Sequence, residues 1–65
     1  MTQDDMAQRL ELLRVEHRDL DGAIVALQSV ATPDLLAIAR LKKRKLLMRD
    51  EMAWLQNQMV PDIIA

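Results

Sequence analysis

Two matched repeats of apolar residues lie on either side of one helix-breaking tripeptide, Thr32-Pro33-Asp34. Within each repeat, successive positions are separated alternately by four and three residues, which keeps them on one side of an α-helix and lets that side pack against another helix. The repeats run in opposite order around the breaker, and the residue numbers of each facing pair sum to 65. The pattern therefore predicts an all-α fold, an antiparallel two-helix hairpin with a coiled-coil-like contact.

We call the predicted contact between the two helices the seam. Its pairs from the turn outward are Leu27 with Ile38, Ile24 with Leu41, Leu20 with Lys45, His17 with Met48, Leu13 with Met52 and Leu10 with Leu55. Polar His17 and Lys45 interrupt the seam, and such interruptions typically fix register and oligomeric state at a cost in stability. An alternative role for His17 is a pH-sensitive group or a metal ligand acting with Asp21, one helical turn further on.

Capping residues predict where the helices begin and end. The hydroxyl of Thr2 can cap the first helix, while Thr32 as a cap and Pro33 at the first helical position favour the start of the second. Pro61 is expected to end that second helix. The expected order is a helix over about residues 3–29, a turn at 30–32, a helix over about 33–59 and a tail at 60–65. We expect one domain, because 65 residues can bury only a small core.

Several apolar residues lie outside the seam. Leu47 and Trp54 are seven residues apart and share a helix face, which Leu36 extends, and Leu12 reaches the level of Trp54 once the hairpin closes. A lone hairpin is marginal, because about 2 kcal/mol per buried apolar residue opposes an ordering cost of about 1.5 kcal/mol for every residue. We therefore expect a homo-oligomer, either a four-helix bundle or a larger assembly. The alternative is that these leucines are isolated surface residues and that Trp54 lies flat on its own hairpin.

Charge is distributed unevenly along the chain, with a net charge of −3 in residues 1–31 and +2 in residues 32–65. The outward cations that could bind a partner or nucleic acid are Arg18, Arg40, Lys42, Lys43, Arg44 and Arg49. One interpretation is a solvated face that complements the acidic first helix, in which Asp21 faces Lys42. The alternative is a surface for phosphates or an acidic protein. The overall net charge of −1 and the absence of interleaved aromatic residues favour the first interpretation.

The residue inventory argues against catalysis and cofactor binding. The chain has no cysteine, one histidine and one glycine, so it offers no thiolate metal site, no cluster of metal ligands and no glycine-rich phosphate loop. No nucleophile and base are paired by their spacing. We expect no catalytic residue, no metal, no cofactor and no enzymatic activity. We also expect neither a signal peptide nor a membrane span, and a cytoplasmic location.

Two motifs occur at a characteristic separation: Glu16-His17-Arg18-Asp19-Leu20-Asp21 with Ile24, and Leu41-Lys42-Lys43-Arg44-Lys45-Leu46 with Arg49-Asp50-Glu51. Over about residues 6–56 the chain resembles the YdcH-like family of small bacterial proteins of unknown function, with Arg49 where that pattern has lysine. The resemblance implies a bacterial, cytoplasmic, non-enzymatic helical hairpin. The resulting hypothesis is a self-associating hairpin that acts as a protein interaction or adaptor module. A nucleic-acid-associated accessory protein is the alternative.

Overall fold

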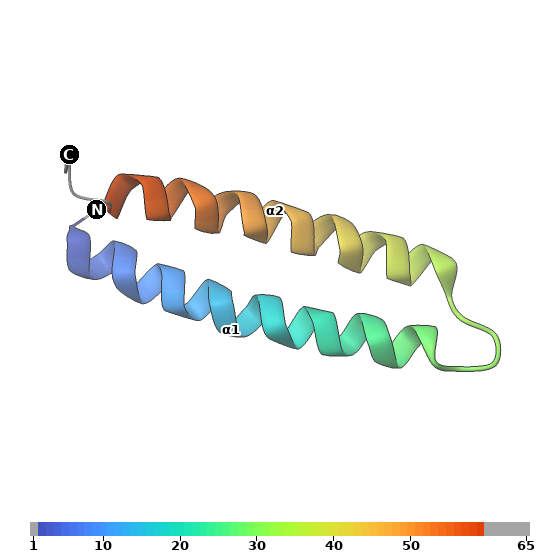
Figure 1. Ribbon diagram of the computed structural model, residues 1–65. Coiled ribbons are helices and arrows are strands. Elements are labelled where there is room, and N and C mark those ends of the chain that lie inside the picture. The colour runs from blue at the N-terminus through green and yellow to red at the C-terminus, as the bar shows by residue number, and fades with distance from the viewer. Residues whose placement is uncertain (1, 60–65) are drawn as a thin grey trace, which may run out of the picture.

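The computed structural model describes residues 2–59, which form two long α-helices. Helix α1 spans Gln3–Gln28 and helix α2 spans Leu35–Met59. The helices run antiparallel, side by side, and a turn joins them at one end of the molecule (Figure 1). The predicted all-α hairpin is therefore confirmed. The expected tail at 60–65, with Pro61, lies outside the described residues.

Reciprocal hydrogen bonds of a capping box hold the beginning of α1. The Thr2 hydroxyl oxygen accepts from the Asp5 amide at 3.1 Å, and the Asp5 carboxylate accepts from the Thr2 amide at 3.4 Å. These bonds satisfy two backbone donors that a helix start otherwise leaves without partners. At the other end, Ser29 closes the helix: its amide donates to the Ala26 carbonyl at 3.2 Å and its hydroxyl to the Val25 carbonyl at 2.7 Å. Helix α1 thus ends at Gln28, one residue before the expected end.

Helix α2 begins two residues later than the sequence predicts, because Asp34 rather than Thr32 supplies its cap. The Asp34 carboxylate accepts from the Ala37 amide at 3.0 Å, and its backbone carbonyl accepts from the Ile38 amide at 3.1 Å. Aspartate is at least as good an N-cap as threonine. With the cap at Asp34, Pro33 precedes the helix instead of opening it. The connection therefore covers residues 29–34, twice the length expected from the sequence.

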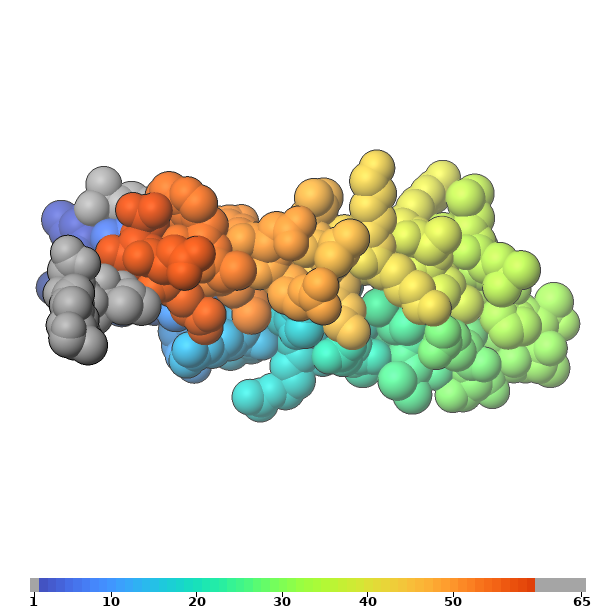
Figure 2. All heavy atoms as spheres, turned by 45° about the horizontal axis from the view of Figure 1, so that its top comes forward, coloured from blue at the N-terminus to red at the C-terminus, as the bar shows by residue number. Residues whose placement is uncertain are grey.

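Side chains from the two helices fill the space between the ribbons, as the space-filling view shows (Figure 2). Among the described residues, the buried side chains all occupy seam positions: Leu10, Leu13 and Ile24 on α1, and Ile38, Met48 and Leu55 on α2. The other seam positions are partly buried: His17, Leu20, Leu27, Leu41, Lys45 and Met52. Burial thus follows the repeat along both helices.

The apolar core is not continuous along the hairpin. Leu10, Leu13, Met48 and Leu55 form one buried cluster, against which Met6, Leu20, Met52 and Met59 pack. Buried Ile24 and Ile38 lie nearer the turn and do not belong to this cluster. His17 on α1 and Lys45 on α2 occupy the intervening stretch of the seam. The side chains of His17 and Lys45 therefore interrupt the apolar core near the middle of the molecule, and both are partly exposed to solvent.

Candidate functional site

The hairpin has two broad faces, each formed by one edge of α1 and one edge of α2, and each carries a shallow hollow. The first hollow has a volume of about 220 Å³ and is lined by His17, Lys42, Lys45, Leu46 and Arg49. The second has a volume of about 330 Å³ and is lined by Glu16, Asp19, Leu20, Ala23, Arg44 and Met48. We call the side of the first hollow the His17 face. The opposite side is the Leu47 face, because Leu47 follows Arg44 by three residues and so shares its side of α2.

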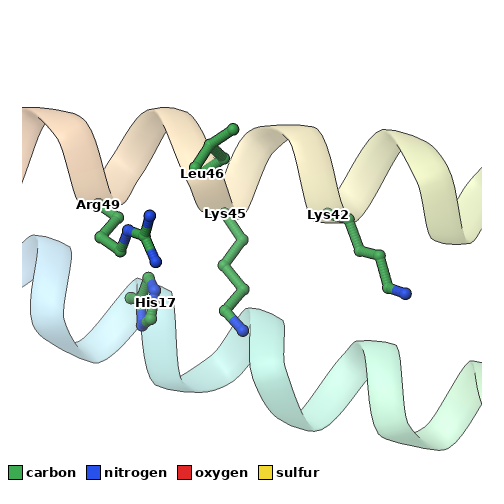
Figure 3. Close-up of a pocket in the computed structure, with 5 residues that line it drawn as sticks. All are labelled: His17, Lys42, Lys45, Leu46 and Arg49. Carbon is green, nitrogen blue, oxygen red and sulfur yellow. The ribbon is translucent and has the colours of Figure 1, made fainter.

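On the His17 face, the imidazole of His17 is held at the edge of the seam with 21% of its side chain exposed. Its Nδ1 lies 3.9 Å from a carboxylate oxygen of Asp21, one turn further along α1. Its Nε2 is buried and has no hydrogen-bond partner among the described residues. Arg49 reaches from α2 toward the ring (Figure 3). Within residues 2–59, Nε2 of His17 therefore has no hydrogen-bond partner, and the ring lines a hollow that also contains three cations.

Lys45 crosses the seam and forms an ion pair with Asp21 of α1. The hydrogen bond from Lys45 is the main reason that the pKa of the Asp21 carboxyl is lowered. Partial burial opposes this shift, and the charge of Lys45 adds to it. The expected partner of Asp21 was Lys42, so the structure corrects that pairing. The reason is that a lysine stem can lie along the apolar seam while its ammonium group reaches the far edge.

The cations of α2 are divided between the two faces. Lys42, Lys45 and Arg49 are spaced by three and four residues, and they line the hollow of the His17 face. Arg44 lines the hollow on the opposite face, and Arg40, four residues earlier, shares its side of α2. Lys43 is three residues before Leu46 and four before Leu47, so it lies on the outer side of α2 between the two faces. Arg18 is exposed on α1. The basic run is thus distributed around α2 rather than gathered on one surface, as the spread of six cations around a helix predicts.

The Leu47 face presents the apolar residues expected to contact another copy. Leu12, Leu36, Leu47 and Trp54 are all about half exposed or more. Each belongs to a stripe with alternating four- and three-residue spacing, which places its members on one side of a helix. On α1 the stripe is Leu12, Glu16, Asp19, Ala23, Ala26 and Val30; on α2 it is Leu36, Arg40, Lys43, Leu47, Asp50 and Trp54. The hairpin therefore has a second pair of matched stripes outside the seam, one on the flank of α1 and one on the outer side of α2.

Net charge differs between the two stripes of the Leu47 face. The α1 stripe contributes Glu16 and Asp19, and the α2 stripe contributes Arg40, Lys43 and one acid, Asp50. Near Trp54, Arg9 of α1 forms a bidentate ion pair with Glu51 of α2, with its Nε at 2.8 Å from one carboxylate oxygen and its terminal nitrogen at 3.3 Å from the other. The hydrogen bond from Arg9 lowers the pKa of the Glu51 carboxyl. This face thus has an acidic edge on α1 and a mainly basic edge on α2.

Two properties of the described residues concern metal binding and membranes. In residues 2–59, no three histidine, cysteine, aspartate or glutamate side chains come together where they could hold a metal ion. Neither α1 nor α2 combines the length and the apolar character that crossing a membrane requires.

Comparison with known protein families shows a match over most of the chain. The family model described as a protein of unknown function (DUF465) matches residues 10–56, which include both sequence motifs and the central part of both helices. No curated protein and no solved structure matches the chain. The match covers most of the seam, both hollows and most of the Leu47 face.

Proposed function

Because the chain belongs to the family of proteins of unknown function DUF465, we propose its function from its surfaces: it is a protein interaction module that self-associates through the Leu47 face. The single observation that carries this proposal is the second pair of matched stripes, whose apolar members Leu12, Leu36, Leu47 and Trp54 are exposed in the single hairpin. Helices that keep an apolar stripe at this spacing bury it against other helices. The proposed assembly is a dimer that forms a four-helix bundle.

The opposite net charges of the α1 and α2 stripes support a second copy of the chain as the occupant of this face. If α1 packs on α2 of the other copy at the same level, Asp19 comes within about one turn of Lys43, while Glu16 lies level with Asp50. If α1 instead packs on α1, the acidic edges meet and repel. Ala23 and Ala26 are small and let the helices approach closely near the turn. The favoured dimer therefore has a two-fold axis along the hairpin and places each α1 on the partner's α2.

Trp54 is expected to contribute most to this contact. It is 55% exposed in the single hairpin, and a tryptophan can bury up to about 250 Å², so a partner could cover about 130 Å² of it. At about 25 cal/mol per Å², that burial is worth about 3 kcal/mol per chain before ordering costs. A two-fold dimer contains the contribution twice.

The test is the concentration dependence of mass and of tryptophan fluorescence. Trp54 is the only tryptophan, so a shift of its emission to shorter wavelength reports burial of this face. Sedimentation equilibrium should show a dimer at micromolar concentration, and Leu47→Ser should weaken it at least tenfold. A monomer at micromolar concentration, with an emission maximum that does not change with concentration, would contradict the proposal.

The matched control is the neighbouring residue. Leu46 is 49% exposed and Leu47 is 58% exposed, but Leu46 lines the hollow of the His17 face. Leu46→Ser removes a similar exposed side chain and should leave the dimer intact. Equal weakening by both substitutions would indicate a general loss of helix stability rather than loss of this contact.

Nucleic-acid binding is the alternative function, and it stays a prediction. The division of the basic run between two faces reduces the charge that either face can offer to a phosphate backbone. A salt titration of DNA or RNA binding, repeated with charge reversal at Lys42, Lys43 and Arg44, tests it directly. Salt-sensitive binding that the reversals abolish would favour this alternative.

The finer identification rests on the two motifs. We propose that the chain is YdcH-like, and with it that the protein is bacterial, cytoplasmic and non-enzymatic, as that resemblance implies. The absence of a nucleophile and base paired by their spacing in the sequence supports the last point.

A further inference from the structure

We propose that the hollow of the His17 face binds a small phosphate-type oxyanion, held by Lys42, Arg49 and His17. This inference goes beyond the proposed function and concerns the opposite side of the hairpin. The observations behind it are a hollow of suitable size, two cations without an ion-pair partner in the described structure, and one unpartnered imidazole nitrogen.

The cations that line this hollow are in excess of the nearby acids. Lys45 is neutralised by Asp21 across the seam, whereas neither Lys42 nor Arg49 forms an ion pair within residues 2–59. Arg49 extends from α2 toward His17, whereas Lys42 extends from α2 toward α1 nearer the turn, on the other side of Lys45 (Figure 3). An arrangement of like charges around one hollow is unfavourable until an anion enters it, since the anion interacts with all of them at once.

The imidazole supplies a directional donor in addition to charge. Nε2 of His17 is buried without a hydrogen-bond partner, and native proteins rarely leave such atoms unsatisfied. A proton on Nε2 can be donated to an anion oxygen. An oxyanion would therefore give a hydrogen-bond acceptor to the one buried side-chain nitrogen that lacks a partner in residues 2–59.

Size and donor chemistry narrow the ligand class. The hollow of about 220 Å³ greatly exceeds the roughly 10–15 Å³ that one water needs, yet it is below the roughly 300–1,000 Å³ of sites for drug-sized ligands. The guanidinium of Arg49 can donate two parallel hydrogen bonds to a phosphate, and Lys42 adds a mobile point charge. These features fit inorganic phosphate or the phosphate group of a small ester.

The test is a titration of the isotope-labelled full chain with inorganic phosphate, followed by NMR and compared with chloride at equal ionic strength. We expect saturable shifts of the His17 ring and Arg49 side-chain signals. In the double variant Lys42→Gln/Arg49→Gln, affinity should fall about fivefold or more, because charge-assisted hydrogen bonds are lost. A parallel titration with a nucleoside monophosphate distinguishes the two sources: tighter binding identifies the ester, and equal or weaker binding identifies free phosphate.

The matched control is the double variant Lys43→Gln/Arg44→Gln, which removes the same charge from adjacent positions that do not line this hollow. It should bind phosphate as the parent chain does. The inference is overturned if the shifts do not saturate, or if both double variants lose affinity equally. It is also overturned if phosphate has no effect but an oligonucleotide binds in a way that depends equally on all four cations.

Discussion

Replacement of His17 by leucine should stabilise the hairpin. His17 occupies a seam position between Leu13 and Leu20, and its buried Nε2 has no partner in the described structure. Leucine would remove that unsatisfied polar atom and extend the apolar cluster of the seam toward the turn. The only polar interaction of the side chain that is lost within residues 2–59 is the 3.9 Å approach of Nδ1 to Asp21, which is too long for a hydrogen bond.

The expected gain can be worked from these contacts. A buried polar atom without a partner costs about 1–3 kcal/mol, and the ring is 21% exposed, so the lower half of that range applies. We expect the free energy of unfolding to rise by about 1–2 kcal/mol. For a chain of this size, each kcal/mol raises the midpoint of thermal unfolding by about 4–8 °C.

Thermal unfolding followed by far-ultraviolet circular dichroism measures this change. Parent and variant should be compared at the same two protein concentrations, because self-association would raise the midpoint of both. His17→Gln is the control, since it keeps a polar group at this position and should give little or no gain. A loss of 1 kcal/mol or more in His17→Leu would refute the reasoning and show that the imidazole makes a polar contact that the fold requires.

Three further predictions concern the helices and the ion pair across the seam. Gly22→Ala should stabilise the chain by about 1 kcal/mol in urea unfolding, because a Cβ atom there meets nothing within 4 Å; destabilisation would mean that this position contacts another copy. Asp34→Ala should cost about 1 kcal/mol through loss of the α2 cap, while Thr32→Ala should cost much less. The pKa of Asp21 is lowered from 3.8, so its contribution to stability is present above pH 3.8 and is lost as pH falls through the lower folded value. Asp21→Asn should therefore reduce the loss of stability measured in acid titrations, and an unchanged acid profile would contradict the role of its pair with Lys45.

The repeat predicted the hairpin because a three-four spacing puts apolar residues in a stripe on one side of a helix, and packing against another helix is the main way to bury that stripe. The same reasoning placed the start of α2 less well. Thr32 and Asp34 are both competent caps, and local propensity does not choose between them. The choice depends on how much chain is needed to reverse direction while Leu27 and Ile38 remain on the seam. That is a property of the closed hairpin, in which residues 29–34 form the connection.

The spacing of the repeat did not predict which residue Lys45 contacts or how the cations of α2 are distributed in space. The spacing predicted that Lys45 lies on the seam, but it did not predict that the long side chain of Lys45 crosses the seam to pair with Asp21. Similarly, the basic run has high charge density along the sequence, although successive residues point about 100° apart on a helix. Three-dimensional charge therefore depends on which face each cation occupies, and neighbours in sequence become members of different surfaces.

This rotation between neighbours makes the two proposals separable by experiment. Leu46 and Lys42 line the hollow of the His17 face, whereas their neighbours Leu47 and Lys43 do not line it. Leu46 and Leu47 are neighbours with the same side chain, and so are Lys42 and Lys43. The same substitution at either neighbour therefore changes helix propensity and net charge almost equally. A difference between neighbours must then come from the face on which each lies. A variant that loses self-association can still be tested for phosphate binding, and a variant that loses phosphate binding can still be tested for self-association.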